Sequence, residues 1–274
     1  MPKPAPATPM YRQPQATDGS ALLAASRAIG IALLFLIGFL LIIPTGAFIR
    51  PRNRVASAVK QKWMQVSLKV LGFRVTVHGH APATHSHSSN TLWVSNHVSW
   101  TDINVLNSLG QVTFLSKAEV RHWPIVGGLA SVAGTLFVQR GAGQGNQAID
   151  DVAHVLDQEQ SVVVFPEATT TDGSDVRRFF HPILKAALIH SHPITPITIR
   201  YLRGGQPCAQ CAYYGDDVFT KHLWRILHYR DVSVAITFHK PIQTQRDDNA
   251  KELAKSLRDT IAEPIAELKN QLSP

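Results

Sequence analysis

A histidine and an aspartate lie five residues apart in the run NHVSWTD, at His97 and Asp102. The preceding run TLWVS is typical of a strand, so it delivers Asn96 and His97 to a strand's carboxyl end, where open α/β sheets place their sites. If the chain turns into a helix there, the Asp102 carboxylate reaches one imidazole nitrogen and leaves the other free to accept a proton. A histidine oriented in this way is a general base near neutral pH.

Two alternatives to this chemistry stay open at this point. A lone histidine near an aspartate is often a satisfied structural pair. Ser99, two residues from His97, is not excluded as a nucleophile by the sequence, although no G-x-S-x-G motif is present. Direct attack by a substrate hydroxyl is the more economical chemistry.

Two further apolar runs end in polar residues. FPEATTTDG follows SVVV, so Pro166 ends a strand and Glu167 and the next three threonines, Thr169, Thr170 and Thr171, form a polar turn. GTLFVQR places Arg140 at the end of another strand, and a guanidinium binds phosphate or carboxylate bidentately. Three strand ends therefore bring together a His–Asp pair, a carboxylate and a guanidinium.

The elements that position these residues alternate between strand-like and helix-like patterns. Strands are predicted for FRVTVHG, TLWVSN, QVTFLSK, TLFVQR, SVVVFPE, ITPITIR and VSVAITF, several of them apolar throughout, as in a sheet covered on both faces. Helices are predicted for residues 146–159, 182–190 and 248–268, with Pro264 kinking or ending the last. The pattern predicts an α/β fold with a mixed, mostly parallel sheet flanked by helices.

The amino-terminal part has a different composition. Residues 1–20 are rich in Pro, Ala, Gln and Thr and are predicted to be a disordered tail. Residues 28–49 carry no charge and are long enough to cross a membrane, so residues 21–49 are predicted to be a membrane anchor helix. Pro44 and Gly46 leave a re-entrant or interfacial helix open. The cations that follow exceed those that precede, which favours an orientation with the following domain on the cytoplasmic side of the membrane.

Residues 50–72 are predicted to be a basic amphipathic helix. Valines and a tryptophan recur at helical spacing at 55, 59, 63, 66 and 70, with lysines between them. Such a helix lies in the headgroup layer or packs on its own domain, and the pattern suits both.

Four motifs in order carry a family resemblance. NHVSWTD is similar to the NHxxxxD motif of the glycerolipid acyltransferases, the group that contains the 1-acyl-glycerol-3-phosphate acyltransferases. GTLFVQR, FPEATTTDG and ITPITI resemble the family's later blocks, and the likeness covers residues 73–242. The resemblance implies a glycerol-3-phosphate acyltransferase-like fold, with residues 73–274 as the acyltransferase domain.

The resemblance also implies roles for individual residues. His97 is expected to take the proton from the acceptor hydroxyl, and Asp102 to orient it. The expected substrate-binding residues are Asn96, Lys117, Arg140, Glu167, Thr169 and Thr170. No metal and no cofactor are implied; the co-substrate is an acyl-CoA or an acyl-carrier-protein thioester. The expected partners are membrane lipids and an acyl carrier protein.

Two departures from the family pattern bear on the acceptor. Ala168 stands where the family has Gly, and Thr170 where it commonly has Arg. The acceptor implied first is 1-acyl-sn-glycerol-3-phosphate, giving phosphatidic acid. The alternative is a lyso-ornithine lipid, because the threonine-rich block and YYGDDVFTKHLW resemble the bacterial branch with that acceptor. A lipid hydrolase, a thioesterase and a non-catalytic lipid-binding protein are more distant alternatives.

Composition narrows the partners only in part. A net charge of +8 favours acidic partners, but no nucleic-acid or nucleotide motif accompanies it. The two cysteines, Cys208 and Cys211, are interpreted as reduced thiols in a loop rather than a redox pair or half a zinc site. The histidines at 78, 80, 85 and 87 are interpreted as part of an exposed loop rather than a metal site.

Overall fold

The structure, a computed structural model, describes residues 19–38, 40, 54–80, 90–118, 135–138 and 144–272 of the chain. Its helices are α1 (Ala21–Ile37), α2 (Arg54–Leu71), α3 (Thr101–Leu109), α5 (Gln144–Asp157), α6 (Lys185–Leu188), α7 (Phe219–His228) and α8 (Ala250–Leu272), with the short 3-10 helices η3 (His181–Leu184) and η4 (Ala209–Cys211). Its strands are β1 (Phe73–Gly79), β2 (Leu92–Ser95), β3 (Val112–Lys117), β4 (Leu136–Val138), β5 (Ser161–Val164), β6 (Ile194–Arg203), β7 (Gln206–Pro207) and β8 (Val232–Phe238).

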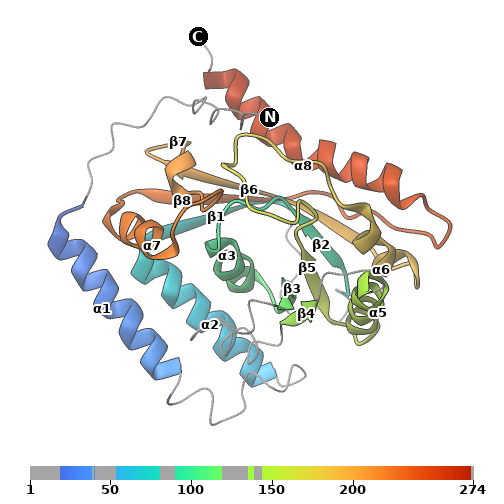
Figure 1. Cartoon of the computed structure of the whole chain (residues 1–274), viewed down its shortest axis with the longest axis horizontal. Coiled ribbons are helices and arrows are strands. Elements are labelled where there is room, and N and C mark those ends of the chain that lie inside the picture. Colours follow the sequence, from blue (N-terminus) through green and yellow to red (C-terminus); the bar gives the residue numbers. More distant parts are fainter. Residues whose placement is uncertain are drawn as a thin grey trace.

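The strands form one mixed sheet in the order β1-β8-β6-β2-β5-β3-β4, with β7 paired to β6 (Figure 1). The pairs from β6 through β2, β5 and β3 to β4 are parallel, and so is β1 with β8. Only β6 with β8 and β6 with β7 are antiparallel. The predicted α/β fold with a mixed, mostly parallel sheet is therefore confirmed.

Both faces of the sheet are covered, which explains the strands that are apolar throughout. Along β2 the buried side chains alternate: Leu92 and Val94 belong to one core cluster, while Trp93 belongs to the other. The cluster of Leu92 includes residues of α5, α6 and α8, and that of Trp93 includes residues of α2, α3 and α7. Figure 1 shows α8 lying across one face, with α3 and α7 on the other.

Helix α2 packs on the domain and also carries α1. Met64, Leu68 and Leu71 are buried, and Gln61 and Gln65 both donate through their side-chain amides to the Ser108 carbonyl at the end of α3. On another side of α2, the ring of Trp63 meets Phe35 of α1 edge-on at 6.0 Å and donates to the Leu34 carbonyl. Helix α2 therefore packs on its own domain through one side and on α1 through another.

Helix α1 exposes most of its large apolar side chains. Ser20 caps its first turn by accepting from the Leu23 N–H, and Ala24 is buried. Its exposed apolar side chains are those of Leu22, Ile29, Leu33, Phe35, Leu36 and Ile37. In the described part of the chain, no helix has the length and hydropathy needed to span a bilayer. Residues 1–18 of the predicted tail and residues 39 and 41–49 of the predicted anchor lie outside the described residues.

Two local predictions are corrected. Helix α8 does not end at Pro264 but continues to Leu272, with Ile261 and Ile265 buried on either side of the proline. Cys208 and Cys211 are not separate thiols: they form a disulfide across the η4 turn, with their Cα atoms 5.4 Å apart.

Candidate active site

The NHVSWTD segment connects the carboxyl end of β2 to the start of α3. His97 follows the strand directly, and Asp102 lies in the first turn of the helix. The amino terminus of a helix carries partial positive charge, which favours an anionic side chain at this place. The predicted turn from strand to helix thus places the carboxylate where the helix stabilises it.

The Asp102 carboxylate is fully buried and accepts four hydrogen bonds. Its Oδ2 accepts from His97 Nδ1 at 2.7 Å and from the backbone N–H groups of Val98 and Ser99 at 2.8 and 3.0 Å. Its Oδ1 accepts from the Tyr201 hydroxyl at 2.7 Å. Charge-assisted bonds of this kind fix the orientation of both partners, so Asp102 holds the His97 ring in one position.

Tyr201 comes from the distant strand β6. Its hydroxyl also lies 2.6 Å from Thr101 Oγ1, and the whole side chain is buried. Burial and the neighbouring Asp102 charge raise the pKa of Tyr201 well above its ordinary value. The phenol therefore stays protonated and serves as a hydrogen-bond donor to Asp102.

The ring of His97 is held on two sides. It stacks on Phe165 with centroids 4.0 Å apart and the planes 12° from parallel. Its Nδ1 proton is directed to Asp102, which leaves Nε2 as the basic nitrogen. The side chain retains 19% exposure, so a substrate can reach it. This arrangement can remove a proton from a hydroxyl group.

Glu167 holds the histidine loop to the FPEATTTDG turn. Its Oε1 accepts from the His97 backbone N–H at 2.8 Å and its Oε2 from the Arg177 backbone N–H at 2.8 Å. Burial raises the pKa of Glu167, and these two backbone donors act in the opposite direction. The adjacent Ala168 has φ +59°, a left-handed conformation that favours Gly. The carboxylate thus binds the protein's own backbone in this structure.

The other predicted site residues fall into three groups. Asn96 is fully buried, and its side-chain amide exchanges two hydrogen bonds with the backbone of Ile199 on β6, so its contacts are structural. Thr169 is exposed and Thr170 is partly exposed, on the same turn as Glu167. Lys117 ends β3 with its side chain outside the described part, and Arg140 lies outside the described residues.

Ser99 does not face a substrate. The residue has no exposed surface, and its hydroxyl has no hydrogen-bond partner among the residues that the structure describes. A nucleophile must contact the group that it attacks, and in this loop His97 is partly exposed whereas Ser99 is not. The geometry therefore favours direct attack by a substrate hydroxyl over a covalent intermediate on Ser99.

Three residues beside the site were missed by the sequence analysis. Tyr201 is the residue after the predicted strand ITPITIR, and no local pattern marked it. Arg177 and Arg178 are exposed between the buried Val176 and Phe179. Their signal was present in the sequence as an Arg-Arg pair following the third motif.

Another histidine, the buried His222 of α7, accepts a hydrogen bond from the loop that carries His97. Trp100 Nε1 donates to His222 Nδ1 at 3.1 Å, and His222 Nε2 lies 3.2 Å from the Cys211 carbonyl. Burial lowers the pKa of His222, so the ring is neutral near pH 7 and accepts from Trp100. Helix α7 and the disulfide turn therefore support the histidine loop.

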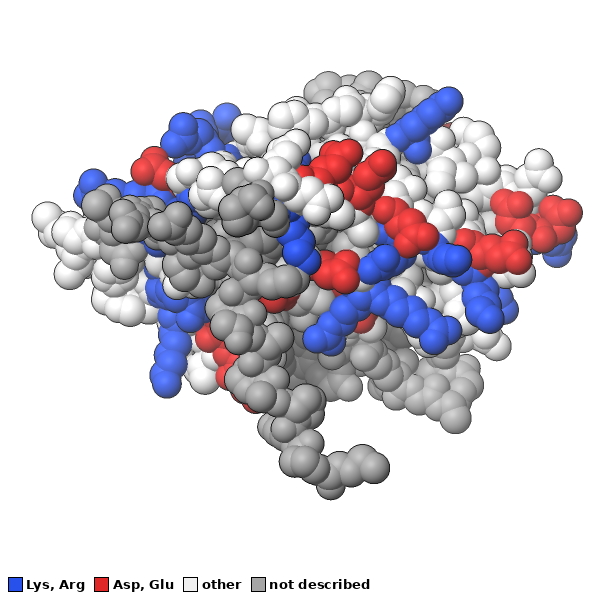
Figure 2. Space-filling view, turned by 90° about the horizontal axis from the view of Figure 1, so that it is seen from above, with Lys and Arg blue, Asp and Glu red and all other residues white. Residues whose placement is uncertain are grey.

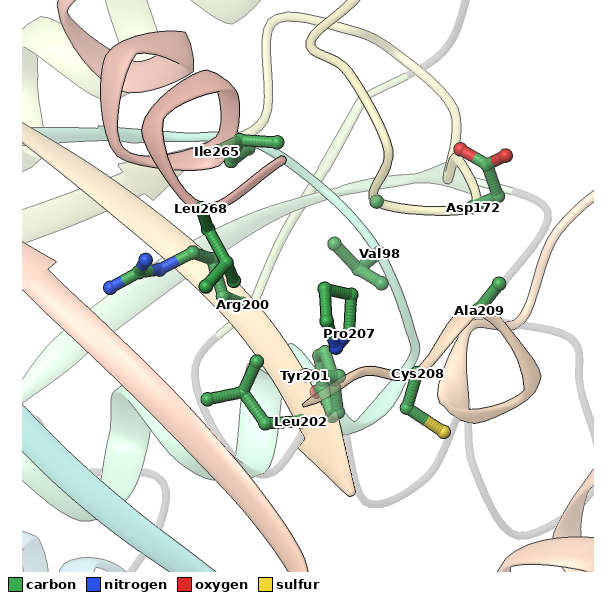
Figure 3. A pocket seen from close by; sticks show the side chains of 11 residues that line it. Val98, Asp172, Arg200, Tyr201, Leu202, Pro207, Cys208, Ala209, Ile265 and Leu268 are labelled. Atoms are coloured by element: carbon green, nitrogen blue, oxygen red, sulfur yellow. The ribbon is translucent and has the colours of Figure 1, made fainter. Parts of the chain in front are cut away.

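A small cavity adjoins the inner side of this loop. Its volume is about 20 Å³, and its lining includes Val98, Tyr201, Pro207 and Cys208 (Figure 3). That volume suits about one water molecule. This cavity is therefore not the groove that a fatty acyl chain needs.

The fold, this site and the comparisons with known proteins identify an enzyme class, the acyltransferases. The chain belongs to the Acyltransferase family, which matches residues 74–200. Over 199 residues it is 41% identical to the lyso-ornithine lipid O-acyltransferase of Pseudomonas aeruginosa, covering 73% of this chain and 75% of that one. It is 26% identical over 220 residues to a 1-acyl-sn-glycerol-3-phosphate acyltransferase of Neisseria gonorrhoeae, covering 80% and 83%.

The fold is also that of a solved structure. The crystal structure of the 1-acyl-sn-glycerophosphate acyltransferase of Thermotoga maritima matches with a TM-score of 0.67, covering 92% of this chain and 97% of that one. The sequence identity is 19%. The family resemblance seen in the four motifs is thus confirmed.

Proposed function

We propose that the chain transfers a fatty acyl group from a thioester to the free hydroxyl of a lyso-ornithine lipid. The observation that carries the reaction is the His97–Asp102 pair, with Nδ1 bound to a buried carboxylate and Nε2 left basic. The choice of acceptor rests on the 41% identity to a lyso-ornithine lipid O-acyltransferase. It reverses the order of acceptors that the motifs implied.

The reaction needs a base and then an acid, and His97 supplies both. Its Nε2 takes the proton from the acceptor hydroxyl as the oxygen attacks the thioester carbonyl. The tetrahedral intermediate then collapses by breaking the carbon–sulfur bond, and the Nε2 proton passes to the thiolate that leaves. Asp102 stays ionised throughout and stabilises the imidazolium that forms between the two steps.

The acceptor headgroup is expected to meet Arg177 and Arg178. Glu167 binds the backbone of His97 with one oxygen and that of Arg177 with the other, so the backbone of the arginine pair begins close to that of His97. A lyso-ornithine lipid presents a carboxylate, which a guanidinium binds bidentately. These cations take the place of the arginine that the family commonly has at the position of Thr170.

The binding role of the arginines is tested by substitution. Arg177→Ala and Arg178→Ala are expected to raise KM for the acceptor at least several-fold while kcat changes less. The control is Arg74→Ala, because Arg74 is an exposed arginine paired with Asp231 elsewhere on the surface. Unchanged KM in both site variants would contradict this subsite.

A panel of acceptors tests the substrate. Purified protein receives a labelled acyl thioester, either of coenzyme A or of acyl carrier protein. The acceptor is lyso-ornithine lipid, lysophosphatidic acid, another lysophospholipid, or no lipid. Transfer to lyso-ornithine lipid at the highest kcat/KM supports the proposal. The second candidate, 1-acyl-sn-glycerol-3-phosphate, is favoured if that acceptor is preferred, as the motif resemblance and the Neisseria relative suggest. Label found only as free fatty acid would refute acyl transfer and indicate a hydrolase.

The catalytic assignment has its own test. His97→Ala is expected to lower turnover by roughly 10²–10⁴-fold, the usual contribution of a general base. Retention of near-normal transfer by a folded variant would remove His97 from the mechanism. The same assay with acyl-CoA and with the acyl thioester of acyl carrier protein identifies the donor. A preference for the second donor would identify acyl carrier protein as a partner.

The enzyme is proposed to sit on the membrane surface, at the cytoplasmic face of the bacterial inner membrane, through α1. The exposed apolar side chains of α1 include Ile29, Leu33 and Leu36. The face that carries α8 differs, because Figure 2 shows acidic and basic side chains intermingled there. The exposed charged residues of α8 include Glu252, Lys255 and Asp259. The free energy falls when apolar surface leaves water, so we expect the apolar side of α1 to face lipid.

Flotation with anionic phospholipid vesicles tests this attachment. A Leu33→Glu and Leu36→Glu double variant is expected to lose most vesicle binding. The control, Lys255→Glu and Lys251→Glu on α8, is expected to float like the wild type. Equal flotation of all three proteins would contradict attachment through this helix.

A further inference from the structure

A group of metal-ligating side chains lies outside the site described above. Asp157 is the last residue of α5, and His190 and His192 lie between α6 and β6. Asp157 Oδ1 is 2.9 Å from His190 Nδ1 and 2.7 Å from His192 Nε2. One ligand atom from each residue lies within 4.8 Å of the other two.

The rings are held in place by the surrounding structure. His192 is buried, with 8% of its side chain exposed, whereas His190 is 56% exposed. The second nitrogen of His192, Nδ1, lies 3.2 Å from the side-chain amide of Asn90. A polar group on the outer nitrogen of a histidine ligand orients the ring and fixes its tautomer, as in many metal sites.

We propose that Asp157, His190 and His192 bind a divalent zinc ion. Two imidazole nitrogens and one carboxylate oxygen are a common zinc donor set, and the remaining position is open to water because His190 faces solvent. Tetrahedral ligands at about 2.0–2.1 Å from zinc lie about 3.3 Å from one another. The two distances from Asp157 Oδ1, 2.9 and 2.7 Å, therefore need to widen by about half an ångström.

Binding requires two proton shifts that the geometry permits. Each ring nitrogen that now donates to Asp157 must give its lone pair to the metal, so each ring moves its proton to its other nitrogen. For His192 that nitrogen is Nδ1, which then donates to Asn90 with the amide turned to present its oxygen. For His190 the other nitrogen, Nε2, has no partner among the described residues.

The site lies at the amino-terminal ends of the parallel strands, whereas His97 lies at their carboxyl ends. Asn90 and His192 precede β2 and β6, and Asp157 precedes β5, whereas His97 and Glu167 follow β2 and β5. A metal here joins the end of α5 to the segment that precedes β6, and so contributes to stability rather than to acyl transfer. The inference does not depend on the proposed function.

The experiment is a titration of the untagged, full-length protein with Zn²⁺, followed by calorimetry and by thermal unfolding. One equivalent is expected to bind, and Tm is expected to rise by about 5–10 °C when free Zn²⁺ is about a hundredfold above Kd. His190→Ala and Asp157→Asn, both at partly exposed side chains, are expected to fold and to lose this binding and the rise in Tm.

Two control variants separate this site from other histidines. His228→Ala on α7 and the double variant His85→Ala with His87→Ala are expected to bind zinc like the wild type. Loss of binding in a control with retention in His190→Ala would overturn the proposal, as would the absence of saturable binding in the wild type.

Discussion

Asp102→Asn separates the charge of the His97–Asp102 pair from its geometry. In the wild type Oδ2 accepts from His97, Val98 and Ser99, and Oδ1 accepts from the Tyr201 hydroxyl. An asparagine with its oxygen in the Oδ2 position keeps the first three bonds. Its NH₂ group then faces the Tyr201 hydroxyl, which can turn and accept. The variant is therefore expected to fold and to keep the histidine oriented.

The expected loss of activity follows from the missing charge. The carboxylate and the imidazolium that forms during turnover are in hydrogen-bond contact, with charge centres about 4 Å apart. At an effective dielectric constant of about 20 their attraction is about 4 kcal/mol. Removing it lowers kcat by about 10³-fold, because about 1.4 kcal/mol corresponds to a factor of ten in rate.

Acyl transfer from a labelled thioester, with thermal unfolding in parallel, measures both parts of this prediction. Asp231→Asn is the control, because Asp231 is exposed and paired with Arg74, and it is expected to keep wild-type turnover. A folded Asp102→Asn protein with kcat within about fivefold of the wild type would refute the electrostatic reasoning. Asp102 would then act only by orienting the ring.

Three further changes test other parts of the structure. Tyr201→Phe removes a buried donor to Asp102, so we expect about 1.5–3 kcal/mol less stability in denaturant unfolding and a lower kcat at similar KM; no change in either would contradict its positioning role. Ala168→Gly relieves a left-handed φ, so we expect a gain of about 0.5–1 kcal/mol by the same method, and a loss would contradict the strain. Burial lowers the pKa of Lys60 to about 8. Between about pH 8 and 10.5 the unfolded chain therefore binds more protons than the folded protein, so the free energy of unfolding of the wild type should rise relative to that of Lys60→Met. A difference that does not change with pH would contradict this.

The sequence predicts the features that depend on neighbours along the chain. Strands that are buried on both faces read as unbroken apolar runs, and SVVV and LWVS are such strands. The His97–Asp102 contact joins residues five apart across a strand-to-helix turn, so spacing alone suggests it. The prediction of domain boundaries stays a prediction.

The rest depends on contacts between distant parts of the chain. Tyr201 reaches Asp102 across 99 residues, and Asn96 reaches Ile199 across 103. Both contacts follow from the register of β6 beside β2, which pairs Ser95 with Ile197. An apolar pattern predicts that a strand is buried but does not specify its register. Helix α8 likewise continues past Pro264 because Ile261 and Ile265 are buried on both sides of it.

The two departures from the family pattern have different consequences. Ala168 takes a left-handed conformation in place of Gly, yet Glu167 beside it still binds the backbone of both His97 and Arg177. The change therefore adds strain without removing the site. Thr170 places a hydroxyl on a partly exposed turn where the family commonly has a charge, so we expect it to alter which headgroup is bound. We therefore expect the Thr170 departure to bear on the acceptor lipid and the Ala168 departure to bear on local stability, while the proposed chemistry of His97 and Asp102 is unaffected by either.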